Sequence, residues 1–470
     1  MILVIFNSYL WNWMWFLMVY FRDYCEDFWS NIAKYVDRKY IVDDDKLHFI
    51  RERKVSLESI IKYPFYDCGR TTAVESINFI RHEHQDKNMT VSKSDISKRR
   101  RLLKEICYID MNEDFIDGIY NDPEGLETFN GKFILAGDTS ICDAPNIGYT
   151  EKELKALNNP NKNRLKKELI RFRVSCIADA LSDFILVAEI QNRHTYSEIQ
   201  LAMRHLDYLN EKMNMHQTIT TYDRGYAALE LMLKHMTINS FFLIRLKSDD
   251  FNNERKYMKT DDEIIEININ SKRTQNFHDE LLKEKAYELG RIPVRITEIE
   301  LINKKGKKYT EILATNLPFD EYPPEILKEL YRKRWKIETN FDRLKNIIHL
   351  ENFSGYSEEI ILQDFYANIF MFNFLMAMKL DADRKVKEKH KDKNLQHEYK
   401  TNLNVLYGLI KLDMPDLLSH NPQKRSDAVD RILKIAESNL VAKDVNSNRN
   451  PDRIVKDPTN KFPPTQRRGE

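Results

Sequence analysis

The pattern of apolar and polar positions along this chain of 470 residues differs from one segment to the next. Short apolar runs bounded by Asp, Asn, Ser or Pro predict strands in the middle of the chain. Longer segments with apolar residues every three or four positions predict amphipathic helices. The predicted strands cover residues 132–138, 171–181, 184–191, 218–223 and 239–247, with helices over 194–213 and 227–236.

Three strands, a helix, a strand and a helix, in that order, are expected of a ribonuclease-H-like core. We therefore predict an α/β fold with a mixed five-stranded sheet flanked by helices. The core would comprise residues 131–247 and 320–385, and β-leaning segments between them predict a β-rich insertion over 248–319. The predicted flanking regions are an apolar segment over 1–21, a helical N-terminal region over 22–130, and a helical C-terminal region with a flexible tail over 386–470.

The stretch YRKRWKIETNFDRLK, residues 331–345, contains no Pro or Gly and predicts a single helix. At about 100° per residue, Tyr331, Arg334, Glu338 and Lys345 fall on one narrow arc. A neighbouring arc holds the apolar residues Leu330, Ile337, Phe341, Leu344 and Ile348. The polar arc suits a metal-binding carboxylate beside phosphate-binding cations, although a solvated face beside a core stripe has the same pattern.

The spacing of these four residues resembles the Tyr-Arg-Glu-Lys signature of the insertion-sequence-four family of bacterial DDE transposases. The resemblance implies two catalytic aspartates upstream, each after a strand. Asp138 ends the strand predicted over 132–138, and Asp223 ends the one before Arg224 and Gly225. Asp143 is a second choice for the first aspartate. From the local pattern alone, Asp138 is also compatible with a turn residue and Asp223 with a helix cap.

The resemblance implies that Asp138, Asp223 and Glu338 are catalytic and hold two Mg²⁺ ions, with Mn²⁺ as a possible substitute, because oxygen ligands favour these metals. Arg334 and Lys345 would neutralise DNA phosphates and Tyr331 would donate to one. Trp335 would stack on a displaced base or pack in the core. The implied reaction is metal-dependent cleavage at transposon ends followed by joining to target DNA, by a homodimer on double-stranded DNA.

A basic cluster precedes the core, where Lys98, Arg99, Arg100 and Arg101 follow one another. We expect Ser94 or Ser97 to cap a helix that carries these cations. Lys and Arg displace counterions from a duplex, so the cluster is suited to phosphate contact, but it is equally suited to a solvated surface. Family members have a similar stretch in their DNA-binding region, which favours end binding.

The overall charge is balanced, with 74 Lys and Arg against 73 Asp and Glu, so affinity for DNA must come from local clusters. The five cysteines are odd in number and include no CxxC pair. This spacing argues against a zinc ribbon or a disulfide framework and favours a reducing, cytoplasmic location.

Two apolar stretches raise the question of a membrane. Residues 1–21 lack a basic leader and are interrupted by polar residues, so a non-spanning segment is favoured over an anchor or a translated leader. Residues 360–380 predict a buried core helix rather than a membrane span.

Three alternative functions remain open from the sequence. A ribonuclease-H-like nuclease without strand transfer would keep the three carboxylates. A catalytically silent protein that binds DNA ends would keep the basic cluster. A membrane protein rests only on residues 1–21.

Overall fold

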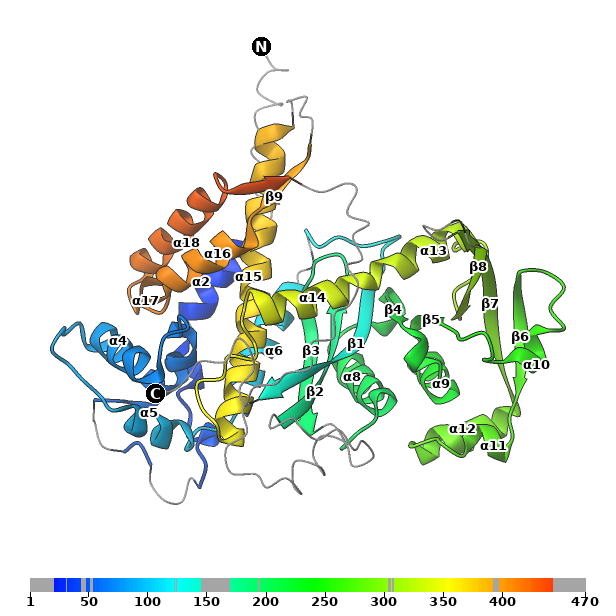
Figure 1. The fold of residues 1–470 in the computed structure, drawn as a ribbon, viewed down its shortest axis with the longest axis horizontal. Helices are drawn as coiled ribbons and strands as arrows, with labels where there is room; N and C mark the ends of the chain where they lie inside the picture. Colours follow the sequence, from blue (N-terminus) through cyan, green and yellow to red (C-terminus); the bar gives the residue numbers. More distant parts are fainter. Residues whose placement is uncertain are drawn as a thin grey trace, which may run out of the picture. The chain divides into compact units, whose positions relative to one another are not determined.

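The structure, a computed structural model, divides into two compact units. Unit 1 takes in residues 1–125, 142–171 and 343–470, and unit 2 takes in residues 126–141 and 172–342 (Figure 1). The helical N-terminal and C-terminal regions, predicted as separate domains, both contribute to unit 1. The predictions for residues 1–20 and for the tail 443–470 lie outside the described residues, which are 21–442 except 31, 44–47, 51–53, 122, 124, 145–169, 193–194, 303–305, 307 and 392–396.

Unit 2 is built on a mixed sheet with strand order β3-β2-β1-β4-β5-β8-β7-β6 (Figure 1). Its first five strands are β1 (Phe133–Ala144), β2 (Ile170–Asp179), β3 (Ile185–Asn192), β4 (Thr218–Tyr222) and β5 (Phe241–Arg245). Strands β1, β4 and β5 run parallel, whereas β2 and β3 pair antiparallel. The five predicted strands are therefore all present and adjacent, within a mixed α/β fold.

The sheet is larger than the predicted five strands because the predicted insertion extends it. The added strands are β6 (Asp262–Asn268), β7 (Arg291–Ile302) and β8 (Lys308–Thr315). Strand β8 pairs antiparallel with β5, with Leu243 opposite Thr315. The last five residues of β8 are buried, so its apolar end completes the hydrogen bonding of β5 rather than forming a separate sheet.

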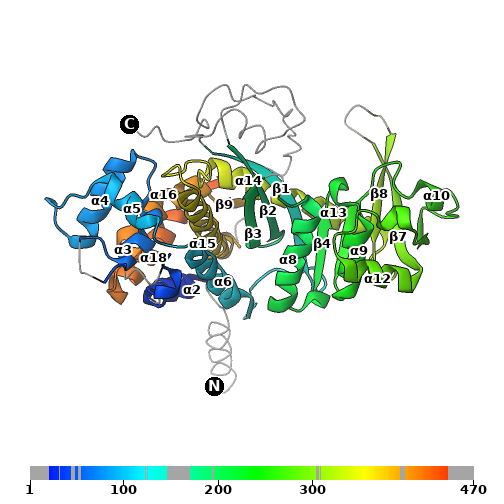
Figure 2. The same ribbon diagram turned by 90° about the horizontal axis from the view of Figure 1, so that it is seen from below.

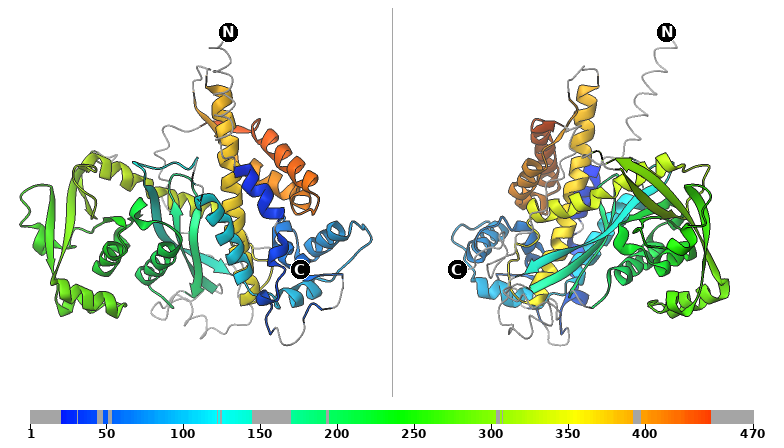
Figure 3. Two further views of the ribbon diagram at one scale, coloured as in Figure 1. Left: turned by 180° about the vertical axis from the view of Figure 1, so that it is seen from behind. Right: turned by 45° about the vertical axis from the view of Figure 1, so that its right-hand side comes forward.

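Helices cover this sheet. Helix α8 (Glu198–Lys212) packs on β3, α9 (Leu229–Thr237) on β5, and α12 (Glu280–Leu289) on α9 and β7 (Figure 3). Ser197 and Gln200 form a capping box that fixes the start of α8. The shorter helices of unit 2 are η5 (Met215–Gln217), η6 (Arg224–Tyr226), α10 (Asn252–Arg255) and α11 (Ser271–Thr274).

Unit 1 is organised around α15 (Glu358–His390), which packs against α2 (Phe21–Ser30) and α6 (Ile106–Asn121) (Figure 2). Within the described residues α15 is the one helix long and apolar enough to cross a membrane, yet 83% of its most apolar window is buried in the protein. This confirms the predicted core helix. The remaining helices and strands of unit 1 are η1 (Ile32–Tyr35), η2 (Arg38–Tyr40), α3 (Leu57–Lys62), η4 (Tyr63–Tyr66), α4 (Thr72–His84), α5 (Lys93–Arg100), β9 (Tyr399–Thr401), α16 (Leu403–Leu412), α17 (Met414–Leu417), α18 (Pro422–Ala436) and β10 (Leu440–Ala442).

Candidate active site

The segment predicted as one helix is divided at Arg334 into α13 (Pro324–Lys333) and α14 (Trp335–Asn346). The Arg334 N–H donates to the Tyr331 carbonyl and the Ile337 N–H donates to the Arg334 carbonyl, each at 3.1 Å. These bonds span three residues instead of four, so the turn is tighter than an α-helix, and the prediction of a single helix was wrong here. The predicted apolar stripe is confirmed, with Leu330, Ile337, Phe341, Leu344 and Ile348 all buried.

Arg334 faces two of the predicted catalytic carboxylates. Its Nη2 donates to Glu338 Oε1 at 2.8 Å, and its Nη1 lies 3.7 Å from Asp138 Oδ2. The Arg334 side chain is buried, and its Nε has no hydrogen-bond partner among the described residues. The Trp335 ring is 4.9 Å from the guanidinium carbon and is 46% exposed, so it is not a core residue. Tyr331 is buried, and its burial raises its pKa to about 12.

Asp138 lies within β1 rather than at its end, because the strand continues to Ala144. The parallel pairing with β4 nevertheless stops at Ala136, two residues earlier, which leaves Asp138 beyond the paired part. The preceding Gly137 has no room for a side chain, since a Cβ there would lie 2.5 Å from the Tyr222 ring. The Asp138 Oδ1 accepts from the Thr139 N–H at 2.8 Å.

Asp223 follows the last residue of β4, as predicted, and its Oδ1 accepts from the Gly225 N–H at 2.7 Å. The pKa of Asp138 responds to the charge of Asp223 and to that of Glu338. Burial raises the pKa of Asp138 to about 6, and repulsion from Asp223 and Glu338 adds to the rise, while the Thr139 N–H and Arg334 oppose it. Asp223 and Glu338, from distant parts of the chain, are therefore both near enough to Asp138 to raise its pKa.

These residues fit a divalent cation in donor chemistry, since all three offer carboxylate oxygens and their mutual repulsion would be relieved by positive charge. As they stand, no three His, Cys, Asp or Glu side chains within the described part of the chain are close enough together to hold a metal ion. The positive charge between Asp138 and Glu338 is that of Arg334.

Lys345 and Asp143 belong to unit 1 and contact a residue that the sequence did not single out, Glu351. The Lys345 Nζ is 3.4 Å from Glu351 Oε1, which also accepts from the Asp143 N–H at 3.1 Å. The Asp143 carboxylate is paired with Arg171 at 3.0 Å. No motif around Glu351 could have revealed these contacts.

The basic cluster lies on α5, whose N-cap is Ser92 instead of the expected Ser94 or Ser97. Its cations differ in environment. Lys98 and Arg101 are exposed, whereas Arg99 is half-buried and donates to the Val55 carbonyl at 3.0 Å.

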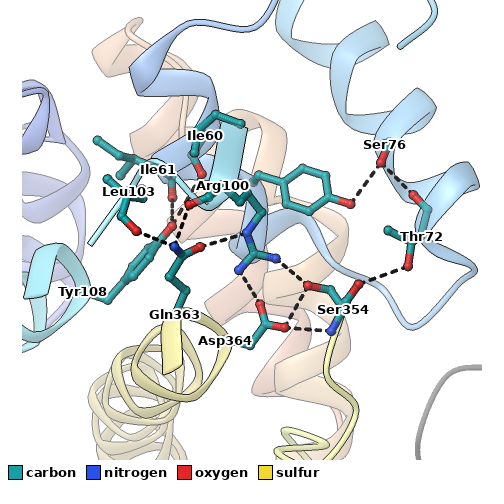
Figure 4. Close-up of polar contacts among 11 residues, drawn as sticks. Ile60, Ile61, Thr72, Ser76, Arg100, Leu103, Tyr108, Ser354, Gln363 and Asp364 are labelled. Atoms are coloured by element: carbon teal, nitrogen blue, oxygen red, sulfur yellow. Dashed lines mark hydrogen bonds and ion pairs between the residues drawn. The ribbon is translucent and has the colours of Figure 1, made fainter. Parts of the chain in front are cut away.

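Arg100 departs from the expected DNA contact because its side chain is buried in unit 1 (Figure 4). It donates to Gln363 at 3.0 Å and to Asp364 at 2.7 Å, and it also binds Ser354. A guanidinium enclosed in this way is occupied in holding α5 to α15.

Two further residues near the carboxylates escaped the sequence reasoning, Glu198 and Tyr226. Glu198 Oε1 accepts from the Thr139 hydroxyl at 3.0 Å, and Tyr226 is buried. The capping-box pattern could have placed Glu198 at a helix start, but only the fold brings it beside Thr139.

Comparisons with known proteins place the chain among transposases. Residues 140–374, half of the chain, match the family described as the transposase DDE domain; the match starts two residues after Asp138 and includes Asp223 and Glu338. Over 90 residues the chain is 32% identical to InsL of insertion sequence element IS186A from Escherichia coli strain K12, and equally to the transposase for insertion sequence element IS421 from Escherichia coli.

Each of these alignments covers 18% of this chain and 24% of the relative, so the chain spans about a quarter of the length of the curated relatives it matches. A solved piggyBac transposase synaptic complex with hairpin DNA aligns over 92% of this chain and 87% of that chain, with 11% identity and a TM-score of 0.42, a level that supports no inference. On the match over half of its length, the chain belongs to the transposase DDE domain family.

Proposed function

We propose that this chain is a transposase of the insertion-sequence-four family that binds the terminal inverted repeats of an insertion sequence and cuts and joins DNA there. The observation that carries the proposal is the position of Arg334, which faces both Asp138 and Glu338. Asp223 adds a third carboxylate from another segment. The strand order β3-β2-β1-β4-β5, with β1, β4 and β5 parallel, is also the order expected of a ribonuclease-H-like core.

In this proposal Asp138, Asp223 and Glu338 hold two Mg²⁺ or Mn²⁺ ions. The ions would activate the attacking oxygen and stabilise the leaving oxygen. Arg334 orients Glu338 through its Nη2, and its positive charge would favour a phosphate oxygen near the carboxylates. Trp335, which is 46% exposed next to Arg334, is placed to stack on a base.

The DNA surface that we propose lies on unit 1 and uses Lys345 and the exposed Lys98 and Arg101. Tyr331, which the sequence also suggested for a phosphate contact, belongs to unit 2 and is left out of this surface because it is buried. Arg99 is available only in part, and Arg100 is left out because it is buried. Two transposon ends must be held together during joining, so we propose a homodimer on double-stranded DNA.

The test is cleavage and joining of a duplex that carries the element's own terminal repeat, with Mg²⁺ or Mn²⁺. Glu338→Gln should abolish metal-dependent nicking while end binding in a gel shift survives. The matched control is Glu329→Gln, which alters an exposed glutamate on α13 that pairs only within its own helix, with Lys333. Equal cleavage by wild type and Glu338→Gln would overturn the assignment, and cleavage without joining would indicate a nuclease.

A further inference from the structure

Glu198, the first residue of α8, contacts the strand that carries Asp138. Its Oε1 accepts from the Thr139 hydroxyl at 3.0 Å, and the N–H of the same threonine donates to Asp138. The nearest cation is Arg173, whose Nη2 is 3.9 Å away, beyond hydrogen-bonding distance. Glu198 is therefore tied to the Asp138 segment, and its carboxylate forms only a long ion pair with Arg173.

The other carboxylate oxygen of Glu198 faces the turn that carries Asp223. A Cβ on Gly225 would lie 2.9 Å from Asp223 Oδ1 and 3.6 Å from Glu198 Oε2. The carboxylates of Asp223 and Glu198 thus both lie beside Gly225, and a side chain at Gly225 would occupy the space between them. Glu198 is in this way adjacent to both catalytic aspartates.

An independent feature in the same place indicates a missing ligand. Tyr226 is 2% exposed, and its hydroxyl has no hydrogen-bond partner among the described residues. The Tyr226 N–H donates to the Asp223 carbonyl at 3.2 Å, so the tyrosine belongs to the turn that carries Asp223. Burial raises its pKa well above the usual value, and repulsion from Asp138, Glu198 and Asp223 raises it further. Leaving a buried hydroxyl unpaired is unfavourable, and a hydrated ligand between these groups would satisfy it.

We propose that Glu198 is a fourth acidic residue of the active site and that its charge, with those of Asp138 and Asp223, binds a divalent cation next to the Tyr226 hydroxyl. This inference rests on the proposed function, because it assigns a further residue to the same metal-dependent centre. Glu198 would act through its negative charge near the cation, in addition to accepting the hydrogen bond from Thr139.

The experiment is a titration of the full chain with Mn²⁺, followed by electron paramagnetic resonance of the free ion, with no DNA present. Glu198→Gln keeps an oxygen that can accept from Thr139 and removes only the charge, so we expect Mn²⁺ affinity to fall about tenfold or more. Thr139→Val removes the hydrogen bond and keeps the charge, and it should change affinity much less. Glu189→Gln is the matched control, since Glu189 on β3 pairs with Arg204 of α8.

Affinities for Mn²⁺ that are equal in wild type, Glu198→Gln and Glu189→Gln, but lost in Asp138→Asn, would overturn the inference and leave the proposed function standing. An equal fall in Thr139→Val and Glu198→Gln would also overturn it, since the glutamate would then act only by positioning. If wild type bound no Mn²⁺, the metal-dependent function and the inference would both fall. Melting temperatures without Mn²⁺ would identify any variant that fails to fold.

Discussion

Two arginines of this protein each face carboxylates, and their surroundings differ. Arg100 in unit 1 uses all three guanidinium nitrogens, on Gln363, Ser354 and Asp364 (Figure 4). Arg334 in unit 2 makes one hydrogen bond, to Glu338, while its Nη1 is 3.7 Å from Asp138 and its Nε has no partner among the described residues.

The difference separates a structural ion pair from one that we propose is functional. A buried charge with every donor satisfied fixes the position of the segments it joins, here α5 and α15. Arg334 keeps an Nε without a partner among the described residues and faces two of the carboxylates that we propose as catalytic. We therefore propose that Arg100 serves stability and Arg334 the reaction, and four predictions test this contrast.

The largest effect is expected at Arg100. Arg100→Gln would leave Asp364 buried without its cation, so the free energy of unfolding should fall by about 3–5 kcal/mol. Urea unfolding measures this, with Arg101→Gln, an exposed neighbour, as the control that should change little. A fall of less than about 1 kcal/mol would remove the distinction between the two arginines.

Arg334→Gln should reduce DNA cleavage strongly and the free energy of unfolding less. DNA cleavage should fall by about 10²- to 10³-fold, because a positioned charge that stabilises the reacting phosphate is lost. The free energy of unfolding should fall by less than in Arg100→Gln, because the partners left behind, Glu338 and Asp138, are more exposed to solvent than Asp364. Single-turnover cleavage and urea unfolding of the same preparation check both parts, and a loss of stability as large as that of Arg100→Gln would contradict them.

The raised pKa of Asp138 predicts a pH-dependent effect in the metal-free protein. With a folded-state pKa of about 6, against 3.8 ordinarily, the folded state binds this proton more tightly than the unfolded state. The ionised carboxylate therefore costs stability above pH 6, and the cost vanishes below about pH 4, where both states are protonated.

Asp138→Asn should accordingly raise the free energy of unfolding at pH 8 by about 1–2 kcal/mol and leave it unchanged at pH 4. Urea unfolding at the two pH values in the presence of a chelator is the measurement. A variant that is less stable than wild type at pH 8 would show that the carboxylate is favourably paired there.

The smallest effect concerns the exposed cations of α5. Replacing Lys98 or Arg101 by Gln should weaken end binding for every sequence alike and reduce the slope of log affinity against log salt by about 1 each. Gel shifts at several KCl concentrations measure the slope. Lys283→Gln on α12, where the lysine pairs with Glu280, is the control, and an unchanged slope in the α5 variants would exclude α5 from the interface.

The order of strands and helices, and the buried face of α13 and α14, could be predicted because they depend on local periodicity. Asp223 could be placed for the same reason, since it follows a β-branched strand and precedes Gly225. The break at Arg334 could not, because it comes from two tight hydrogen bonds within a segment of good helix formers.

Long-range contacts account for the other differences. Residue Arg100 has the same local pattern as its neighbours, and only its contact with Asp364, 264 positions away, makes it structural. Glu198 lies 59 positions from Thr139, so no motif joins them. The extension of the sheet by β8 likewise depends on pairing with β5, which the alternation of apolar residues does not specify.

Unit 1 is assembled from segments that are far apart in the sequence, which limits how early it can fold during synthesis. Helix α2 packs against α15 and α18, whose residues leave the ribosome more than 300 positions later. Helix α2 must therefore wait, with apolar surface uncovered, until α15 and α18 have been made. A chain that stops before α15 would lack the partner of α2 and α6, so we expect such translation products to be degraded or to aggregate.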